Sequence, residues 1–270
     1  MSDPLQELSV SAVAPSLRPS VPALCLGAAT LVLAALSAGA RAQASFDIVG
    51  LRPGMTEAEA MAALNAHRGG MQVHKRNMSF SYSDGAQQHN TPPFLFELLA
   101  VANDAGGNED FRLYFAPPPS EPRLVGLLRQ VKLQAPPTQA QLSEQLSRKY
   151  GPPTVTGKNY STLQLVWGEA GKPMCWRQTP KTTVIGVGDG GEILPNLVQG
   201  QAKGWAPKDL SQCGLAASAT LAGEPVHNLT VRVSDYGAWA ESQLKARQWV
   251  EGLKQDAIKA RLAKGSGPKL

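Results

Sequence analysis

The sequence predicts an α+β fold with two helix-plus-antiparallel-sheet units and an amphipathic helix at the C-terminus. Three observations lead to this fold class. The same helix-start motif occurs twice, short runs of alternating apolar residues follow each copy, and the strand–helix–strand alternation of a parallel sheet is not seen. Hydrophobic residues make up 43% of the 270 residues and charged residues 17%, a composition that excludes an intrinsically disordered chain.

Residues 1–42 have the pattern of a secretory signal peptide. An uncharged apolar run occupies 21–38, and Ala-x-Ala cleavage sequences overlap at Ala40, Ala42 and Ala44. We therefore expect an exported protein, periplasmic or secreted. The alternative is an uncleaved inner-membrane anchor, because an apolar run of 18 residues is close to the minimum that spans a bilayer.

The first unit is predicted at 46–134. A short strand is expected at 46–49, and Thr56 with Glu59 forms a T-x-x-E capping box, in which each side chain accepts a hydrogen bond from the other's backbone amide. Gly69 and Gly70 end the helix that follows. Alternating apolar residues then predict strands in PFLFELLAVA, FRLYF and RLVGLLRQVKL.

The second unit is predicted at 136–235 and repeats this order. Thr138 and Gln141 form the second capping box, and Gly151 with two prolines ends the helix. Strands are expected in LQLVWG, PMCWRQ, TTVIGV, GLAASATLA and NLTVRVS. The two helix starts indicate an internal duplication, although two unrelated amphipathic helices would look similar, and both interpretations stay open.

A closing helix and a short tail are predicted at 236–270. Seven Lys or Arg residues stand against three acidic ones there, so most of the chain's net charge of +5 lies in this segment. Three interpretations stay open. The helix packs on the domain through its Trp residues and leaves its charged face solvated, it contacts an anionic partner or membrane surface, or it forms a mobile tail. A net charge of only +5 for the whole chain does not indicate nucleic-acid binding. The candidate partner surface consists of Trp239, Lys245, Arg247, Trp249 and Lys254.

The cysteine count predicts one disulfide. Cys25 lies within the apolar run, so Cys175 and Cys213 are the thiols that remain after signal cleavage. An oxidising compartment favours their pairing. The alternative is two buried free thiols.

No catalytic or metal-binding constellation is visible, and we expect a non-enzymatic protein without cofactor or metal. The chain has no G-x-S-x-G motif and no two histidines four residues apart. A glycine-rich run at 185–195 is interpreted as a turn, because a phosphate-binding loop needs a helix directly after it and Pro195 begins a Gly/Pro-rich stretch. Asp189 and Glu192 in this run are too few for a calcium site.

Tryptophans suggest a rival function. Trp167, Trp176 and Trp205 lie in the second unit, where they would form a glycan-binding platform if exposed and a core if buried. Because Trp167 belongs to an alternating strand, the core interpretation is favoured.

Two motifs resemble the SmpA/OmlA (BamE) family of small envelope lipoproteins. GLRPGMTEAEAMAAL resembles the helix start of that family, and KYGPPT followed by LQLVWG resembles its helix, G-x-P and aromatic strand. The resemblance implies tandem units with a helical layer over an antiparallel sheet, used for protein contacts. This chain differs in having no lipid-receiving cysteine after its apolar run. Its layout is also similar to that of secreted β-lactamase inhibitor proteins.

These observations predict an exported periplasmic protein that acts as a non-enzymatic protein-binding module of the cell envelope. Its partner would be another envelope protein, with contact to a membrane surface through the basic C-terminal helix as a weaker hypothesis. The alternative function is a cell-wall glycan-binding protein or hydrolase.

Overall fold

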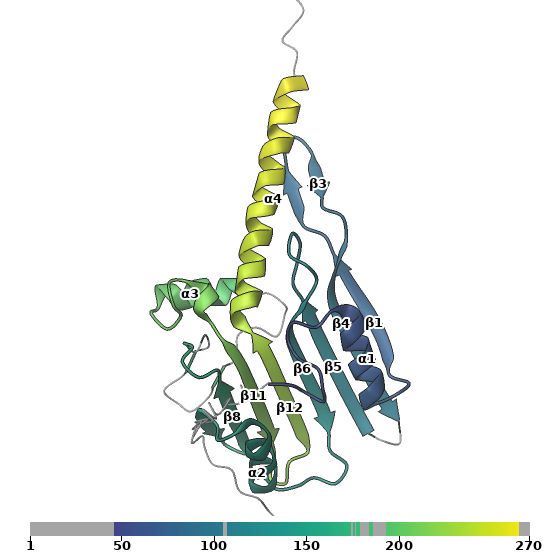
Figure 1. Cartoon of the computed structure of the whole chain (residues 1–270), viewed down its shortest axis with the longest axis vertical. Coiled ribbons are helices and arrows are strands. Elements are labelled where there is room, and N and C mark those ends of the chain that lie inside the picture. Colours follow the sequence, from purple (N-terminus) through teal and green to yellow (C-terminus); the bar gives the residue numbers. More distant parts are fainter. Residues whose placement is uncertain are drawn as a thin grey trace, which may run out of the picture. The chain divides into compact units, whose positions relative to one another are not determined.

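The computed structural model describes residues 46–104, 107–173, 175, 177–178, 184–185 and 193–264 (Figure 1). Within these residues the fold is α+β, as predicted, with four α-helices and an eight-stranded antiparallel sheet. The predicted signal peptide at 1–42 lies outside the described residues. Among the helices described, none is both long and apolar enough to cross a membrane.

The first unit contributes one helix and four strands to this arrangement. A small separate hairpin, β2 (Ser81–Ser83) with β3 (Gln88–Asn90), is inserted between its first two sheet strands. Its main elements are α1 (Glu57–His67), β1 (Gln72–Met78), β4 (Phe94–Asp104), β5 (Gly107–Phe115) and β6 (Leu124–Lys132).

The second unit has the same order of elements, followed by the closing helix α4 (Tyr236–Lys264). Its main elements are α2 (Gln139–Tyr150), β7 (Val155–Asn159), β8 (Thr162–Gly168), β11 (Leu215–Ala222) and β12 (Asn228–Asp235). Between β8 and β11 lie β9 (Arg177–Gln178), β10 (Val184–Ile185), α3 (Leu194–Ala202) and a 3₁₀ turn, η1 (Leu210–Gln212).

The two units share one sheet. Its strand order is β1-β4-β5-β6-β12-β11-β8-β7, so β6 and β12 pair antiparallel at the centre and the second half runs in reverse order to the first. A two-fold rotation between β6 and β12 would relate two units with this order. The shared topology, one helix followed by four strands, favours the duplication suggested by the helix starts.

Both predicted capping boxes are present. The Thr56 hydroxyl accepts from the Glu59 amide at 3.2 Å, and the Glu59 carboxylate accepts from the Thr56 amide at 2.8 Å. Thr138 and Gln141 make the same pair of contacts at 3.2 and 2.9 Å. Four amides at the two helix starts thereby gain acceptors that the helices themselves cannot supply, which explains why α1 and α2 begin where the motifs predict.

One face of the sheet is covered by α1 and α2. Leu64 of α1 and Leu142 of α2 belong to the same buried cluster as Phe111 and Trp167 of the sheet. The segment before α1 joins this layer, since Phe46, Ile48 and Leu51 are 5%, 2% and 0% exposed. We expected a strand at 46–49; the chain instead makes a single bridge between Ile48 and Leu51 and turns away.

The other face is covered by the first half of α4 and by α3. Asp235 caps α4 by accepting from the Ala238 amide at 2.9 Å. Trp239 then lies over Gly126 of β6, at a spot where a Cβ atom on residue 126 would clash with the indole ring. The same ring stacks on Tyr114 of β5, with ring centroids 5.4 Å apart. These contacts join α4 to the two strands on the first-unit side of the sheet's centre.

The expectation that no helix follows the glycine-rich run is wrong. Helix α3 begins at Leu194 and has Pro195 in its first turn, where the missing proline N–H would have no partner in any case. Its N-terminal amides, those of Ile193 and Leu194, donate to Gln243 of α4 at 3.2 and 2.9 Å. A tertiary contact therefore caps α3, which has no capping side chain of its own. Residues 186–192 of the run lie outside the described residues.

Replacing Gly126 by alanine should destabilise the protein by about 2 to 3 kcal/mol, because the added methyl group displaces the Trp239 ring from its seat. Urea denaturation measures the change. Gly69→Ala is the matched control, since a Cβ atom there meets no neighbouring atom, and its change should stay within about 0.5 kcal/mol. If the two substitutions lowered the free energy of unfolding equally, the packing of the Trp239 ring would not require a glycine at position 126.

Candidate functional site

The residues of the candidate partner surface differ in exposure. Trp239 is only 2% exposed and packs on the sheet, so its place on an outer surface is a wrong prediction. Lys245 and Arg247 are exposed, whereas Trp249 and Lys254 are half-buried. Trp239 was placed on the surface because helical spacing alone does not show which apolar residue faces the sheet.

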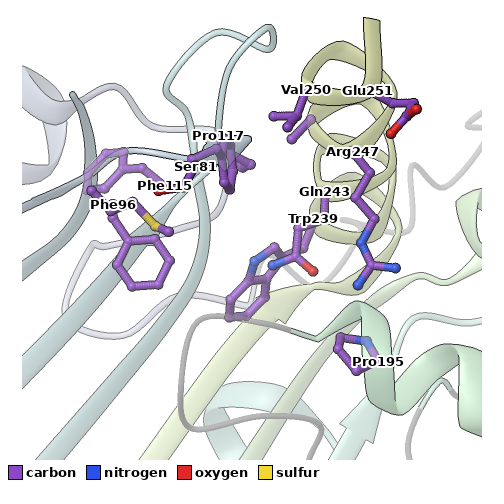
Figure 2. A pocket seen from close by; sticks show the side chains of 13 residues that line it. Ser81, Phe96, Phe115, Pro117, Pro195, Trp239, Gln243, Arg247, Val250 and Glu251 are labelled. Carbon is purple, nitrogen blue, oxygen red and sulfur yellow. The ribbon is translucent and has the colours of Figure 1, made fainter. Parts of the chain in front are cut away.

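A pocket of about 370 Å³ lies next to Trp239 (Figure 2). One wall is the first half of α4, and the others come from the hairpin region, from β4 and β5, and from the start of α3. Its lining is mostly apolar. The lining residues are Met78, Phe80, Ser81, Phe96, Phe115, Pro117, Pro195, Trp239, Gln243, Ala246, Arg247, Val250 and Glu251.

A β-bulge directs one of these side chains toward the pocket. Arg76 of β1 pairs with Glu97 of β4, but the next residue, Asn77, pairs with Leu95, so Phe96 is an extra residue in β4. Phe96 thereby packs on the α4 side of the sheet, with its ring 6.1 Å from that of Tyr114. The bulge is not visible in the sequence, which only shows an apolar run.

The pocket is apolar at depth and polar at its rim. Phe115 and Trp239 are 1% and 2% exposed, whereas Ser81, Arg247 and Glu251 are exposed. Among the described residues, Arg247 has neither an ion pair nor a hydrogen bond. The Glu251 carboxylate accepts from Lys254 at 3.3 Å and from Gln255 at 2.7 Å, and these contacts lower the pKa of Glu251. Of the two charged lining residues, Arg247 is therefore the one whose charge is available to bind a ligand.

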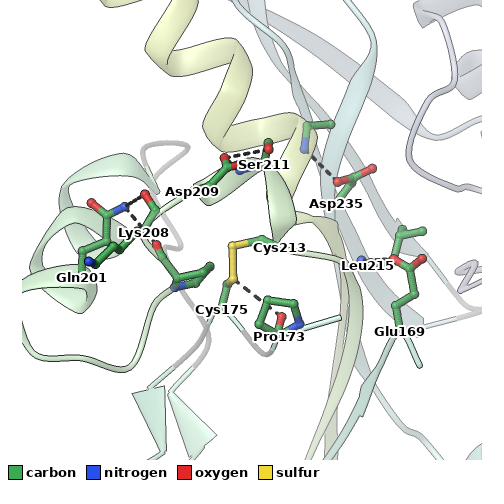
Figure 3. Close-up of a disulfide and its surroundings, with 12 residues drawn as sticks. Glu169, Pro173, Cys175, Gln201, Lys208, Asp209, Ser211, Cys213, Leu215 and Asp235 are labelled. Atoms are coloured by element: carbon green, nitrogen blue, oxygen red, sulfur yellow. Dashed lines mark hydrogen bonds between the residues drawn. A yellow bond between two sulfur atoms is a disulfide. The ribbon is translucent and has the colours of Figure 1, made fainter. Parts of the chain in front are cut away.

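The predicted disulfide between Cys175 and Cys213 is present (Figure 3). Both residues are buried, at 1% and 3% exposure, in the cluster that also holds Trp239. Cys213 follows η1, and its carbonyl approaches Gly237 at the start of α4 so closely that a side chain at 237 would clash with it. The disulfide therefore supports the end of α4 that carries the pocket. Such a bond is typical of an oxidising compartment.

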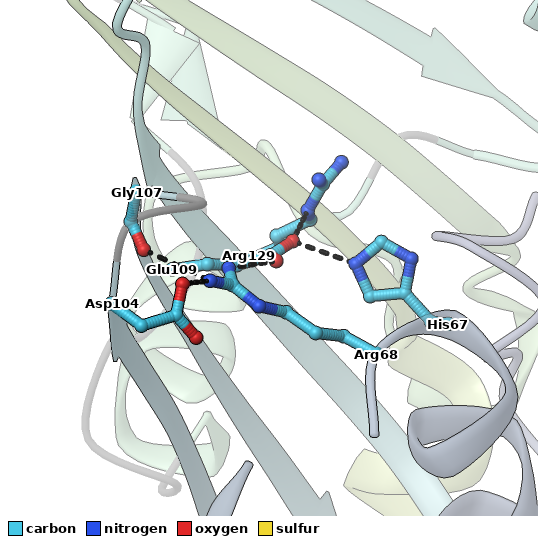
Figure 4. Close-up of polar contacts among 6 residues, drawn as sticks. All are labelled: His67, Arg68, Asp104, Gly107, Glu109 and Arg129. Atoms are coloured by element: carbon cyan, nitrogen blue, oxygen red, sulfur yellow. Dashed lines mark hydrogen bonds and ion pairs between the residues drawn. The ribbon is translucent and has the colours of Figure 1, made fainter. Parts of the chain in front are cut away.

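A buried carboxylate forms the centre of a polar cluster on the opposite face (Figure 4). Glu109, 4% exposed, lies 3.0 Å from the His67 ring and accepts from Arg68 at 3.4 Å and Arg129 at 2.5 Å. Burial alone raises the pKa of Glu109, but Arg129 and His67 together hold it below the ordinary value of 4.5. Arg68 also donates to Asp104. The cluster ties the end of α1 to β4, β5 and β6.

No cluster of three or more His, Cys, Asp or Glu side chains suited to a metal ion occurs in the part of the chain that the structure describes. His67 and His89 instead face single carboxylates, those of Glu109 and Asp84. Asp189, Glu192 and Trp176 lie outside the described residues. The core interpretation holds for Trp167, which is 2% exposed.

Comparisons of the chain with protein-family models, with curated proteins and with solved structures find no match. The resemblance to the SmpA/OmlA (BamE) family therefore stays a prediction from the two motifs that suggested it. The pocket has to be interpreted from its own residues.

Sequence reasoning missed most of the pocket. Phe96, Phe115 and Pro117 come from two strands and a loop that only the folded sheet brings beside α4. One local signal was available, because the three prolines after Ala116 mark the end of β5. Arg247 was identified, but as part of an outer surface.

Removing the disulfide in a Cys175→Ala, Cys213→Ala variant should lower the free energy of unfolding by about 4 kcal/mol, the chain-entropy value for a loop with a sequence separation of 38. Guanidinium denaturation measures this loss, and the wild type under reducing conditions should match the variant. An unchanged free energy of unfolding would contradict a supporting role for the bond.

Glu109→Gln should destabilise the protein by about 2 to 3 kcal/mol at pH 7, because Arg68 and Arg129 lose their buried partner. The folded-state pKa of Glu109 lies below its unfolded value. The charged Glu109 therefore stabilises the folded protein fully above pH 4.5. This stabilisation is lost as the pH falls below 4.5 and through the folded-state pKa.

The difference in the free energy of unfolding between the wild type and Glu109→Gln should therefore become smaller when urea denaturation is repeated below pH 4. Glu121→Gln, which removes an exposed pair with Arg123, is the control and should change stability by less than about 1 kcal/mol. If this difference in the free energy of unfolding did not change with pH, the carboxylate charge would not be what stabilises the cluster.

Proposed function

We propose that the protein is an exported, non-enzymatic binding module of the bacterial cell envelope, and that it holds an acidic protein partner along the second half of α4. The observation that carries this proposal is the contrast between the two halves of that helix. Tyr236, Trp239 and Ala246 are buried, whereas no residue in 251–263 is. A helix segment without a buried face gains little stability from the fold that carries it.

The charge of α4 indicates the kind of partner. Six Lys or Arg residues stand against three acidic ones between Tyr236 and Lys264. All three acidic side chains lie within 3.7 Å of a lysine on the same helix. In the second half of the helix, Arg261 is left without a carboxylate partner in the described part of the chain. A surface with surplus cations attracts an acidic one.

Apolar residues on the same helix segment favour a protein over a simple polyanion. Leu262 is 65% exposed, and Trp249, Leu253 and Ile258 are only half-buried. The hairpin of β2 and β3 lies beside this segment (Figure 1), and Arg261 comes close to Gly85 at its turn. An amphipathic helix with a partly covered apolar stripe suits binding in a partner's groove.

The export part of the proposal is supported by the disulfide and by the signal-peptide pattern at 1–42. The non-enzymatic part is supported by the absence of a catalytic motif from the sequence. The glycan-binding alternative drew on the tryptophans and on Asp189 with Glu192. Burial of Trp167 and Trp239 weakens the first basis, and the two acidic residues lie outside the described residues. Contact with a membrane surface uses the same basic helix and becomes an outcome of the test.

A photo-crosslinking amino acid in place of Leu262 should give a discrete protein adduct in an envelope extract, and high salt should weaken it because the contact is electrostatic. The control places the same group at Tyr160, which is 95% exposed on the turn between β7 and β8. This design avoids deleting α4, whose first half belongs to the core.

Adducts analysed by mass spectrometry give three distinct results. A protein adduct from position 262 alone supports the proposal. Adducts to phospholipid alone support the membrane-surface alternative, whereas identical adducts from positions 262 and 160, or none from either, contradict a partner site on α4.

A further inference from the structure

The geometry points to a second binding site, in the pocket beside Trp239, for a small amphiphile with an apolar chain and a single carboxylate. This inference does not rest on the proposed protein partner, because it concerns the first half of α4 and the sheet under it. A volume of about 370 Å³ falls in the range of small-molecule sites.

The buried end of the pocket determines the apolar part of the ligand. Phe115, Pro117, Trp239 and Ala246 line it and are buried, and none of these side chains carries a charge. Figure 2 shows Phe96 and Phe115 on the sheet side and Trp239 below α4. An alkyl chain that binds between them is transferred from water to an apolar surface. The free energy of this transfer is favourable in proportion to the apolar area removed from water.

The exposed end determines the charged part. Arg247 lies at the rim, one turn along α4 from Gln243, and its guanidinium is directed toward Pro195 (Figure 2). Since Arg247 has no ion pair within the described residues, an anionic headgroup finds an uncompensated cation there. The Ser81 hydroxyl, by contrast, is already engaged with Asn90 at 2.6 Å. A guanidinium binds a carboxylate with two parallel hydrogen bonds.

Glu251 restricts the charge of the headgroup to one. It lines the same rim one turn further along α4 and is negatively charged at neutral pH, with its oxygens bound to Lys254 and Gln255. A second negative charge on the ligand would lie close to this carboxylate, because the Lys254 paired with it does not line the pocket. The rim therefore favours a carboxylate over a dianionic phosphate.

Isothermal titration calorimetry on the purified protein with its disulfide intact tests this site, using decanoate, decanol and decyltrimethylammonium below their aggregation concentrations. Decanoate should bind most tightly and the ammonium compound least. Arg247→Gln should weaken decanoate binding about five- to tenfold and leave decanol binding unchanged. Lys245→Gln is the control, because Lys245 lies on the same helix, does not line the pocket and should have no effect.

A second pair of variants tests the pocket itself. Val250→Trp should fill it and abolish binding of decanoate and decanol alike, whereas Leu253→Trp, less than one turn away and outside the lining, should not. Circular dichroism checks folding, and Ser81→Trp at the opposite rim replaces Val250→Trp if that variant does not fold. The proposal is overturned if decanoate does not bind, if the ammonium compound binds equally well, or if the filled pocket still binds decanoate.

Discussion

The contact between Trp239 and Gly126 is the constraint on which the α4 side of the molecule depends. Only a glycine in β6 leaves room for the indole ring at this point of the sheet, and the ring also stacks on Tyr114. The ring is at once the contact that seats α4 and a buried wall of the pocket. The position of the second half of α4 follows, because it continues the same 29-residue helix.

The arrangement of the sheet explains why one of its faces is available for α4 and Trp239 to pack on. Pairing β6 with β12 joins two similar units into one continuous surface, and α1 and α2 cover one face of it. The other face packs against α4, α3 and the disulfide-bonded residues Cys175 and Cys213. Both proposed binding sites use α4. The sheet provides the scaffold, and the pocket forms where α4 and α3 pack beside the ends of β1, β4 and β5.

Sequence reasoning succeeded where the decisive interactions are local and failed where they are not. The capping boxes at Thr56 and Thr138 join residues three apart, and both helix starts were predicted correctly. The disulfide followed from a count of cysteines and an expected compartment. The seat of Trp239, the bulge at Phe96 and the capping of α3 by Gln243 each join distant segments, so the pocket and α3 were not predicted.

Native-state hydrogen exchange on a Trp239→Ala variant tests most directly whether this seat positions α4. Our interpretation predicts that the amides of the first half of α4, up to Val250, lose protection, while those of the paired strands β11 and β12 keep most of theirs. Leu244→Ala, at a residue 39% exposed on the same helix, should leave the pattern unchanged. Full protection of α4 in the Trp239→Ala variant would contradict the claim that the contact with Gly126 holds the helix on the sheet.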